Sequence, residues 1–198
     1  MVQFAIFRTC HLKRLDNHLL RLMKKSTSFV SRLLAIVAIS VFASVATAET
    51  KVKLSDVHLC CGACQKGVER AVSKVSGSSV QVDRKAGSVV VSAGDAATVK
   101  KALNAIGRAG YYGKSNNSKL QIAEGKVGNG RLNNASVSGA HLCCGKCVKA
   151  IDEVVASVNG ATGHDAKKGS KTFTIKGSYS AKELAAAFHK QGLSAQIK

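Results

Sequence analysis

The stretch His58-Leu59-Cys60-Cys61-Gly62-Ala63-Cys64 returns as His141-Leu142-Cys143-Cys144-Gly145-Lys146-Cys147, with six of the seven positions identical. The second copy begins 83 residues after the first (141 − 58 = 83), and the two copies hold six of the chain's seven cysteines. Within 198 residues, a repeat of this length predicts two small domains in tandem. Thiols grouped twice in one pattern indicate soft-sulfur chemistry, which leaves metal binding, disulfide exchange and structural bridging open.

Each cysteine stretch is followed by apolar residues at helical spacing, i, i+3, i+4 and i+7. They are Val68, Ala71, Val72 and Val75 in the first copy, and Ile151, Val154, Val155 and Val158 in the second. This spacing predicts an amphipathic helix after each stretch. Gly77 and Gly160 follow the apolar runs, where a helix C-terminal cap favours a residue that tolerates positive φ. An alternating segment over residues 52–57 predicts a strand before the first cysteine stretch.

The remainder of each copy predicts two strands, a second helix and a closing strand. The strands are expected around Val80–Val82, over 88–92 and over 172–176, and the closing strands over 111–115 and 194–198. The second helices carry Val99, Ala102, Leu103 and Ile106 in one copy and Leu184, Ala187 and Phe188 in the other, and are followed by Gly110 and Gly192. The order β-α-β-β-α-β predicts an α+β fold of two ferredoxin-like domains in tandem, over 49–115 and 131–198.

Between the domains, residues 116–130 are rich in Asn, Gly, Ser and Lys. This composition predicts a flexible linker that lets the copies move relative to each other, with one short extra strand over 119–122.

The first 48 residues predict a leader and signal peptide. A basic segment starts at Met23-Lys24-Lys25, an apolar run follows over 33–45, and Ala46-Thr47-Ala48 has the small residues of a cleavage site. The run is shorter than the roughly 20 residues that span a bilayer, although an uncleaved anchor stays open. We therefore expect a periplasmic or secreted protein, cleaved near Ala48, with Cys10 removed.

The chain carries a net charge of +19, of which residues 1–48 contribute +6 (seven Lys/Arg and one Asp), leaving +13 for the rest. A basic surface in contact with solvent explains this charge. The more specific alternative is weak association with anionic membrane surfaces. Export and the lack of an aromatic-rich basic motif argue against nucleic acid as a partner.

Cys61/Cys64 and Cys144/Cys147 form C-x-x-C pairs whose second member falls in the first turn of a predicted helix. The positive end of a helix favours a thiolate, and Lys66, Lys146 and Lys149 add positive charge nearby. Gly62 and Gly145 are expected to let the loop bend so that both sulfurs face one ion. Paired thiolates suit Cu(I), Hg(II) or Cd(II), with Zn(II) a borderline fit, and we expect one ion per domain.

On these residues each copy resembles a heavy-metal-associated domain, the module of copper chaperones, metal-pumping ATPase arms and periplasmic mercury-binding proteins. The resemblance covers roughly 50–115 and 131–198. It implies the β-α-β-β-α-β fold and a metal ion held by the cysteines of an M-x-C-x-x-C motif, here Cys61/Cys64 and Cys144/Cys147. It also implies a role in metal scavenging, buffering or delivery, with a membrane metal transporter as a partner.

The chain departs from the family motif at two positions per copy. Leu59 and Leu142 replace the Met that usually fills the core beneath the loop, a change of similar volume. Cys60 and Cys143 replace the common Thr and are candidate third ligands, although each could also be a buried small residue or be paired in a disulfide.

His58 and His141 lie two residues before these extra cysteines, on the same face if the strand continues, and could complete a Cys₃His site. His164 and His189 do not recur and are interpreted as surface residues. Tyr111 and Tyr112 lie at the start of a closing strand near the metal loop of the family, where core packing is expected.

Two other functions stay open. An exported C-x-x-C protein could be a thiol-disulfide oxidoreductase, but thioredoxin-like folds place a cis-proline beside their site and this chain has no proline. The cysteines could instead staple the domains, and a bridge between the copies would stabilise more than a C-x-x-C pair because it closes a longer loop. No nucleophile triad, paired carboxylates or phosphate loop supports other catalysis, so the sequence predicts a binding protein and not an enzyme.

Overall fold

Apolar side chains alternate along the first strand of each repeat, and this alternation defines where the core lies. The computed structural model describes residues 49–198, and Thr47–Lys198 form one unit of the chain. In the first repeat Val52 and Leu54 are fully buried between exposed neighbours, and Ala135 and Val137 are their counterparts in the second. Each strand therefore has one face in a core and one in solvent.

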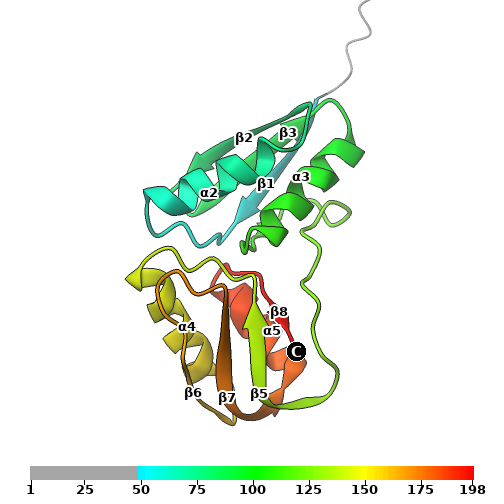
Figure 1. Cartoon of the computed structure of the whole chain (residues 1–198). Coiled ribbons are helices and arrows are strands. Elements are labelled where there is room, and N and C mark those ends of the chain that lie inside the picture. Colours follow the sequence, from blue (N-terminus) through cyan, green and yellow to red (C-terminus); the bar gives the residue numbers. More distant parts are fainter. Residues whose placement is uncertain (1–48) are drawn as a thin grey trace, which may run out of the picture. The chain divides into compact units, whose positions relative to one another are not determined.

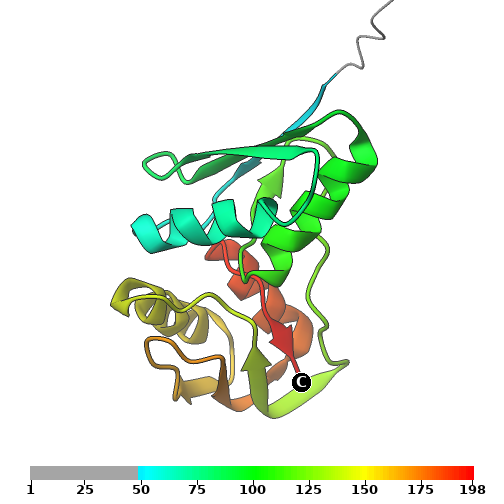
Figure 2. The ribbon, with the colours of Figure 1, turned by 45° about the horizontal axis from the view of Figure 1, so that its top comes forward.

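The first repeat contains β1 (Thr50–Ser55), α2 (Gly62–Val72), β2 (Ser78–Asp83), β3 (Ser88–Ala93), α3 (Ala96–Arg108) and β4 (Lys114–Ser115). Its four strands form an antiparallel sheet in the order β2-β3-β1-β4. The two helices lie together against this sheet (Figures 1 and 2).

The second repeat contains β5 (Arg131–Ser138), α4 (Gly145–Ser157), β6 (Ala161–His164), β7 (Thr172–Ser180), α5 (Ala181–Lys190) and β8 (Gln196–Ile197). Its strands pair in the equivalent order, β6-β7-β5-β8, again antiparallel. The fold is thus α+β with two four-stranded antiparallel sheets and four helices in the described residues, which confirms the predicted class and is consistent with two ferredoxin-like domains.

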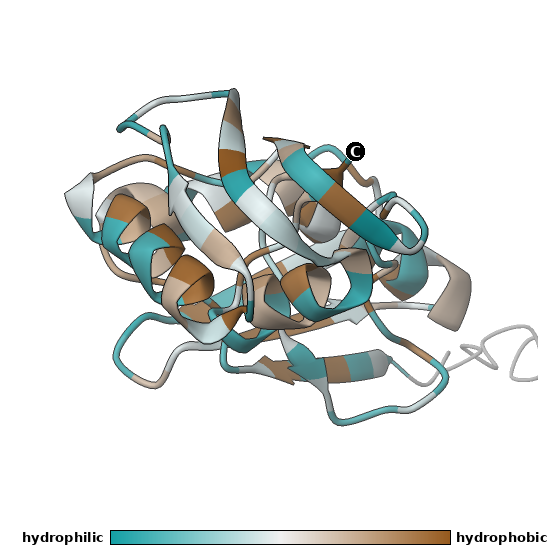
Figure 3. Cartoon of the chain, turned by 90° about the horizontal axis from the view of Figure 1, so that it is seen from below, coloured by the Kyte–Doolittle hydropathy of each residue, from teal (hydrophilic) through white to brown (hydrophobic). Residues whose placement is uncertain are grey.

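The helices bury most of the residues that their spacing predicted, although Val155 is only half-buried. Val68, Ala71 and Val72 of α2 are buried, as are Ile151 and Val154 of α4. Figure 3 shows hydrophobic residues interrupting the hydrophilic surface of the helices at this spacing. Each helix therefore has one apolar stripe turned to its core.

Some predicted boundaries were wrong. The α2 helix ends at Val72, so Val75 lies beyond it, and the positive φ of Gly77 (76°) belongs to the turn before β2. The closing strands are two residues each, because Tyr111 and Leu193 do not join their own sheets and instead form a bridge with each other, one from each repeat.

Residues 116–130, predicted as a flexible linker, include a buried side chain and form backbone bonds with the second repeat. Ile122 is buried, with only 4% of its surface exposed, and Val127 forms a parallel bridge with Ile197 beside β8. The backbone of Ile197 also donates to the Lys126 carbonyl at 2.8 Å. The expected strand over 119–122 is not formed, because this stretch is a turn and a bend followed by residues without regular secondary structure.

The predicted leader, signal peptide and cleavage site, together with Cys10, lie outside the described residues. Within residues 49–198, no helix combines the length and apolar character needed to cross a membrane.

Candidate metal centre

The two C-x-x-C pairs lie at helix N-termini, as predicted. Cys61 is the N-cap of α2 and Cys144 the N-cap of α4, both with extended backbone. Cys64 and Cys147 follow in the first helical turn and are fully buried. Unpaired amide groups and the helix dipole at this end stabilise negative charge, so the local fold favours thiolates at these positions.

The two cysteine loops meet, and this contact was not predicted from the sequence. The Cys60 sulfur lies 3.4 Å from that of Cys144, and the Cys61 sulfur lies 3.5 Å from that of Cys143. All six cysteines are free thiols, so these separations are non-bonded contacts and not the roughly 2.05 Å of a disulfide. Six sulfur atoms from two distant stretches of chain therefore share one cluster.

The cluster has approximate two-fold symmetry. Adding 83 to the number of a cysteine in the first repeat gives its counterpart in the second. When both cysteines of a contact between the repeats are replaced by their counterparts, the result is another observed contact. The symmetric pairs are Cys60–Cys144 (3.4 Å) with Cys61–Cys143 (3.5 Å), and Cys60–Cys147 (3.6 Å) with Cys64–Cys143 (3.5 Å). Within the repeats the sulfur distances are 3.5–3.8 Å, as for Cys60–Cys64 and Cys144–Cys147. The repeated sequence thus produces a repeated geometry.

Backbone contacts of two glycines hold the loops together. The Gly192 carbonyl accepts from the amides of His58 (3.2 Å) and Tyr112 (3.0 Å), and the Gly110 carbonyl accepts from Ser194 (3.1 Å). Both glycines have positive φ, 90° at Gly110 and 68° at Gly192, which is typical of a residue just after a helix C-terminus. Both also sit so close to the opposite loop that a Cβ atom would collide with backbone. Close approach of backbones is a second use of glycine here.

The recurring histidines point into the cluster without a hydrogen-bond partner. The Nε2 atoms of His58 and His141 are both buried and unpaired among the described residues. The His141 ring packs on Tyr111, with ring centroids 4.6 Å apart. Burial lowers the pKa of His141, which favours the neutral imidazole that a metal ligand requires. A buried nitrogen without a partner is costly, and a bound metal ion would satisfy it.

The surroundings of the sulfur atoms give the thiols different pKa values. The backbone amide of Cys64 is the largest cause of the lowered pKa of Cys61, about 6; burial opposes it, and the Cys143 thiol then adds to the lowering. Burial, followed by the contact with Cys61, raises the pKa of Cys143 to about 12. Burial also raises the pKa of Cys60. The pKa therefore differs among the half-buried thiols, because Cys61 favours the thiolate while Cys60 and Cys143 keep their protons.

The two innermost thiols behave as a pair. The mutual contact of Cys64 and Cys147 is the largest cause of both shifts, and it raises the pKa of Cys64 and lowers that of Cys147. Burial adds to the rise at Cys64. Burial, followed by the charge of Cys64, raises the pKa of the Tyr111 hydroxyl. Such a pair shares one proton between two sulfurs. Soft cations displace this proton when they bind, so metal binding at the cluster releases protons.

Four groups of donor atoms could hold a metal ion, each with all donors within 4.8 Å of one another. They contain every predicted ligand. The groups are His58, Cys60 and Cys147; Cys64, His141 and Cys143; Cys60, Cys61 and Cys64; and Cys61, Cys143 and Cys144. The structure thus places the extra cysteines and both histidines beside the C-x-x-C sulfurs.

Two other expectations need correction. His164 is not a surface residue, because only 10% of its side chain is exposed and its Nε2 lies 2.8 Å from an Asp152 carboxylate oxygen. His189 stacks on Tyr112 with ring centroids 3.8 Å apart. Gly62 and Gly145 are the first helical residues and do not have positive φ, so the loop does not require their freedom.

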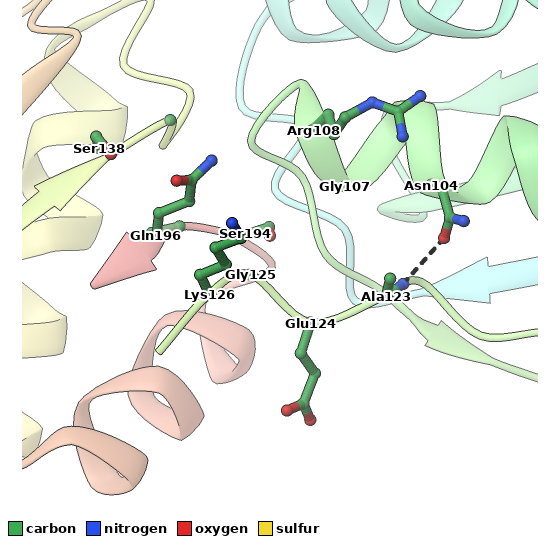
Figure 4. A pocket seen from close by; sticks show the side chains of 12 residues that line it. Asn104, Gly107, Arg108, Ala123, Glu124, Gly125, Lys126, Ser138, Ser194 and Gln196 are labelled. Carbon is green, nitrogen blue, oxygen red and sulfur yellow. Dashed lines mark hydrogen bonds between the residues drawn. The ribbon is translucent and has the colours of Figure 1, made fainter. Parts of the chain in front are cut away.

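Another cavity, away from the sulfurs, lies where the end of α3 meets residues 123–126 and the segment 194–196 (Figure 4). Its side chains include Arg108, Glu124 and Gln196, and Figure 4 shows the Ala123 amide bonded to Asn104 at 3.3 Å. It contains no cysteine or histidine, so it offers no soft metal ligand.

Comparisons with known proteins do not identify a family. No family model and no curated protein matches the chain. Among solved structures, the first two RRM domains of the yeast poly(U)-binding protein Pub1 are similar over 75% of this chain and 98% of that one. The identity is 10% and the TM-score 0.22, values too low to support an inference about function.

Proposed function

We propose that this protein binds soft metal ions through the thiolates of Cys61, Cys64, Cys144 and Cys147, in the manner of the heavy-metal-associated domains that its repeats resemble. The observation that carries this proposal is the convergence of six free thiols and two buried, unpartnered imidazole nitrogens on one cluster. A hydrophobic core would not leave these nitrogens unpaired, because each loses hydrogen bonds to water without replacement.

The chemistry of the donors limits the cargo. Thiolates select Cu(I), Hg(II) and Cd(II), and imidazole adds Zn(II) and copper to the ions that fit. Half-buried sulfurs such as Cys61 and Cys144 hold part of the cargo, so a partner thiolate can reach the ion. Scavenging, buffering and delivery to a membrane transporter all use this exchange of ligands. The predicted signal peptide makes the periplasm or the cell exterior the proposed location.

The test is native mass spectrometry of the full chain, purified without oxidation, before and after metal removal. Bound soft metal with free thiols after removal supports the proposal. The variant C61S/C64S/C144S/C147S should lose tight binding, by more than roughly 1,000-fold in competition with a chelator, because each thiolate supplies a metal bond. The matched control is H164N, which removes an imidazole outside the four donor groups. Tight binding retained by the quadruple variant would refute the assignment.

A thiol-disulfide oxidoreductase is the second candidate, favoured by the lowered pKa of Cys61 and by the close sulfur contacts. A metal-free protein that loses two hydrogens per cysteine pair and reduces a disulfide substrate would support this function. Permanent bridges that resist mild reductant would instead indicate structural cysteines.

A further inference from the structure

Three of the four donor groups take ligands from both repeats, and the two of these that contain a histidine are named the crossed groups. His58 and Cys60 of the first repeat lie with Cys147 of the second. Cys64 of the first repeat lies with His141 and Cys143 of the second, and these two groups share no donor. A metal ion in either group would therefore be bound by both repeats at once, and not by the C-x-x-C pair of one domain.

The other two groups connect these crossed groups. One contains Cys60, Cys61 and Cys64, and the other contains Cys61, Cys143 and Cys144. Four sulfurs thus belong to two groups each, namely Cys60, Cys61, Cys64 and Cys143. A sulfur that serves two neighbouring ions is a bridging thiolate, so full occupancy of the four groups requires a polynuclear centre.

From this arrangement we propose that the two repeats build one shared Cu(I)–thiolate centre of four ions, with His58 and His141 as ligands in the two crossed groups. The inference rests on the proposed function and specifies its cargo and stoichiometry. Each Cu(I) has three donors, and the six thiolates and two imidazoles supply the required twelve bonds because four sulfurs bridge.

The number and spacing of the donors favour Cu(I) over Zn(II). Each of these four groups contains three donors, whereas structural Zn(II) takes four protein ligands in a tetrahedron. Metal–sulfur bonds of about 2.3 Å place the sulfurs of a trigonal site about 4 Å apart. The observed sulfur separations of 3.4 Å (Cys60–Cys144) to 3.8 Å (Cys144–Cys147) reach this value with small outward shifts.

The charge of the centre is also compatible with its surroundings. Four Cu(I) ions and six thiolates sum to −2 when both imidazoles are neutral, and the six thiol protons leave to solvent. Lys66, Lys146 and Lys149 lie on the two helices whose N-termini carry the cluster. The helix N-termini and these ammonium groups oppose the negative charge.

The experiment is an anaerobic titration of the reduced full chain with Cu(I) against a Cu(I)-specific chelator, followed by native mass spectrometry and copper X-ray absorption. We expect a direct transition from the metal-free chain to a chain with four coppers, with the intermediate species scarcely populated. The absorption spectrum should contain a short Cu–Cu scattering path and an imidazole contribution. Both readouts use the unmodified protein, so neither depends on whether a variant folds.

Variants test the crossed ligands. H58N/H141N should remove the imidazole contribution and weaken chelator-competitive loading by at least tenfold, while H164N, which removes an imidazole outside the cluster, should change neither. The single variant C147S should also perturb the copper bound by His58 and Cys60 of the other repeat, and thus abolish the four-copper species.

The outcomes separate this inference from the proposed function. Two coppers that bind independently, one lost with each repeat's C-x-x-C pair, would overturn the shared centre and leave soft metal binding in place. Two tightly bound Zn(II) ions in preference to Cu(I) would overturn the copper assignment alone. No tight binding of any soft metal would refute both.

Discussion

At the scale of single residues, Tyr111 connects the core to the cysteine loop. Its side chain is fully buried, and its hydroxyl donates to the Cys64 carbonyl at 3.0 Å. Gly67 lies so close that an added Cβ would collide with this hydroxyl. The predicted core role of Tyr111 is thus correct but incomplete, because the residue also positions the first turn of α2 beneath the sulfurs.

Removing this hydroxyl should destabilise the metal-free protein. Y111F removes one hydrogen bond from the Cys64 carbonyl, which costs about 0.5–1.5 kcal/mol of unfolding free energy. The ring contact with His141 stays in place. Urea denaturation measures the effect, and Y112F is the control because no hydrogen bond of the Tyr112 hydroxyl is seen in residues 49–198. Equal losses in both variants would contradict a role for this hydrogen bond.

At the scale of elements, side-chain caps define the N-termini of α3 and α5, the two helices that do not carry cysteines. Asp95 is the N-cap of α3 and accepts from the Thr98 amide at 2.8 Å and from its hydroxyl at 2.7 Å. Ser180 caps α5 in the same manner. The cysteine-bearing α2 and α4 have no side-chain cap bond. Their first turns therefore keep backbone N–H groups available to negative charge at the sulfurs.

The Asp95 cap should make stability depend on pH. The Thr98 hydroxyl and then its amide lower the pKa of Asp95, so the unfolded chain binds more protons at acidic pH. The contribution is complete above the unfolded pKa of about 3.9 and is lost as the pH falls through the folded value. D95A should lower Tm by about 2–4 °C at pH 7 and by less at pH 2.5.

Thermal unfolding at both pH values, followed by circular dichroism, measures this difference. E153A is the matched control, since it removes an exposed carboxylate from within α4. A Tm difference for D95A that is the same at both pH values would show that the charge of Asp95 is not the cause.

At the scale of the whole described molecule, backbone atoms as well as side chains make the contact between the repeats. Gly110 and Gly192 lie against the opposite loops, and Tyr111 pairs with Leu193 across the repeats. Residues 122–127 add contacts through the buried Ile122 and through Val127 beside β8. The tight approach of the six sulfurs depends on these contacts as well as on the cysteine spacing.

G192A should open the sulfur cluster. A Cβ at this position collides with the backbone of Asp56 and His58, so the loops must separate. We expect alkylation of the buried Cys64 and Cys147 to become roughly tenfold faster, corresponding to about 1.4 kcal/mol of easier opening.

Mass spectrometry after timed alkylation of the metal-free, reduced protein measures these rates. The matched control is G169A, which has a similar positive φ of 82° but no atom within 4 Å of the added Cβ. Both variants pay the cost of a left-handed backbone, about 1–2 kcal/mol, and only G192A adds the collision. Equal alkylation rates in the two variants would show that the glycine contact does not hold the loops together.

Short-range patterns in the sequence predicted most of the helices and strands and their order. The 83-residue repeat, the alternation in β1 and the helical spacing in α2 and α4 predicted the α+β order, because burial selects side chains with the period of each element. The position of Cys61 and Cys144 at helix N-termini was predicted for the same reason.

The tertiary structure alone decided that the two cysteine loops form one cluster. Its contacts join atoms from opposite repeats through the carbonyls of Gly110 and Gly192, and backbone atoms carry no side-chain pattern that a sequence displays. The direction of His58 and His141 follows from this packing too. Sequence therefore determined which donors the protein has, and the fold determined that they act together, because ligand geometry depends on distances between residues far apart in the chain.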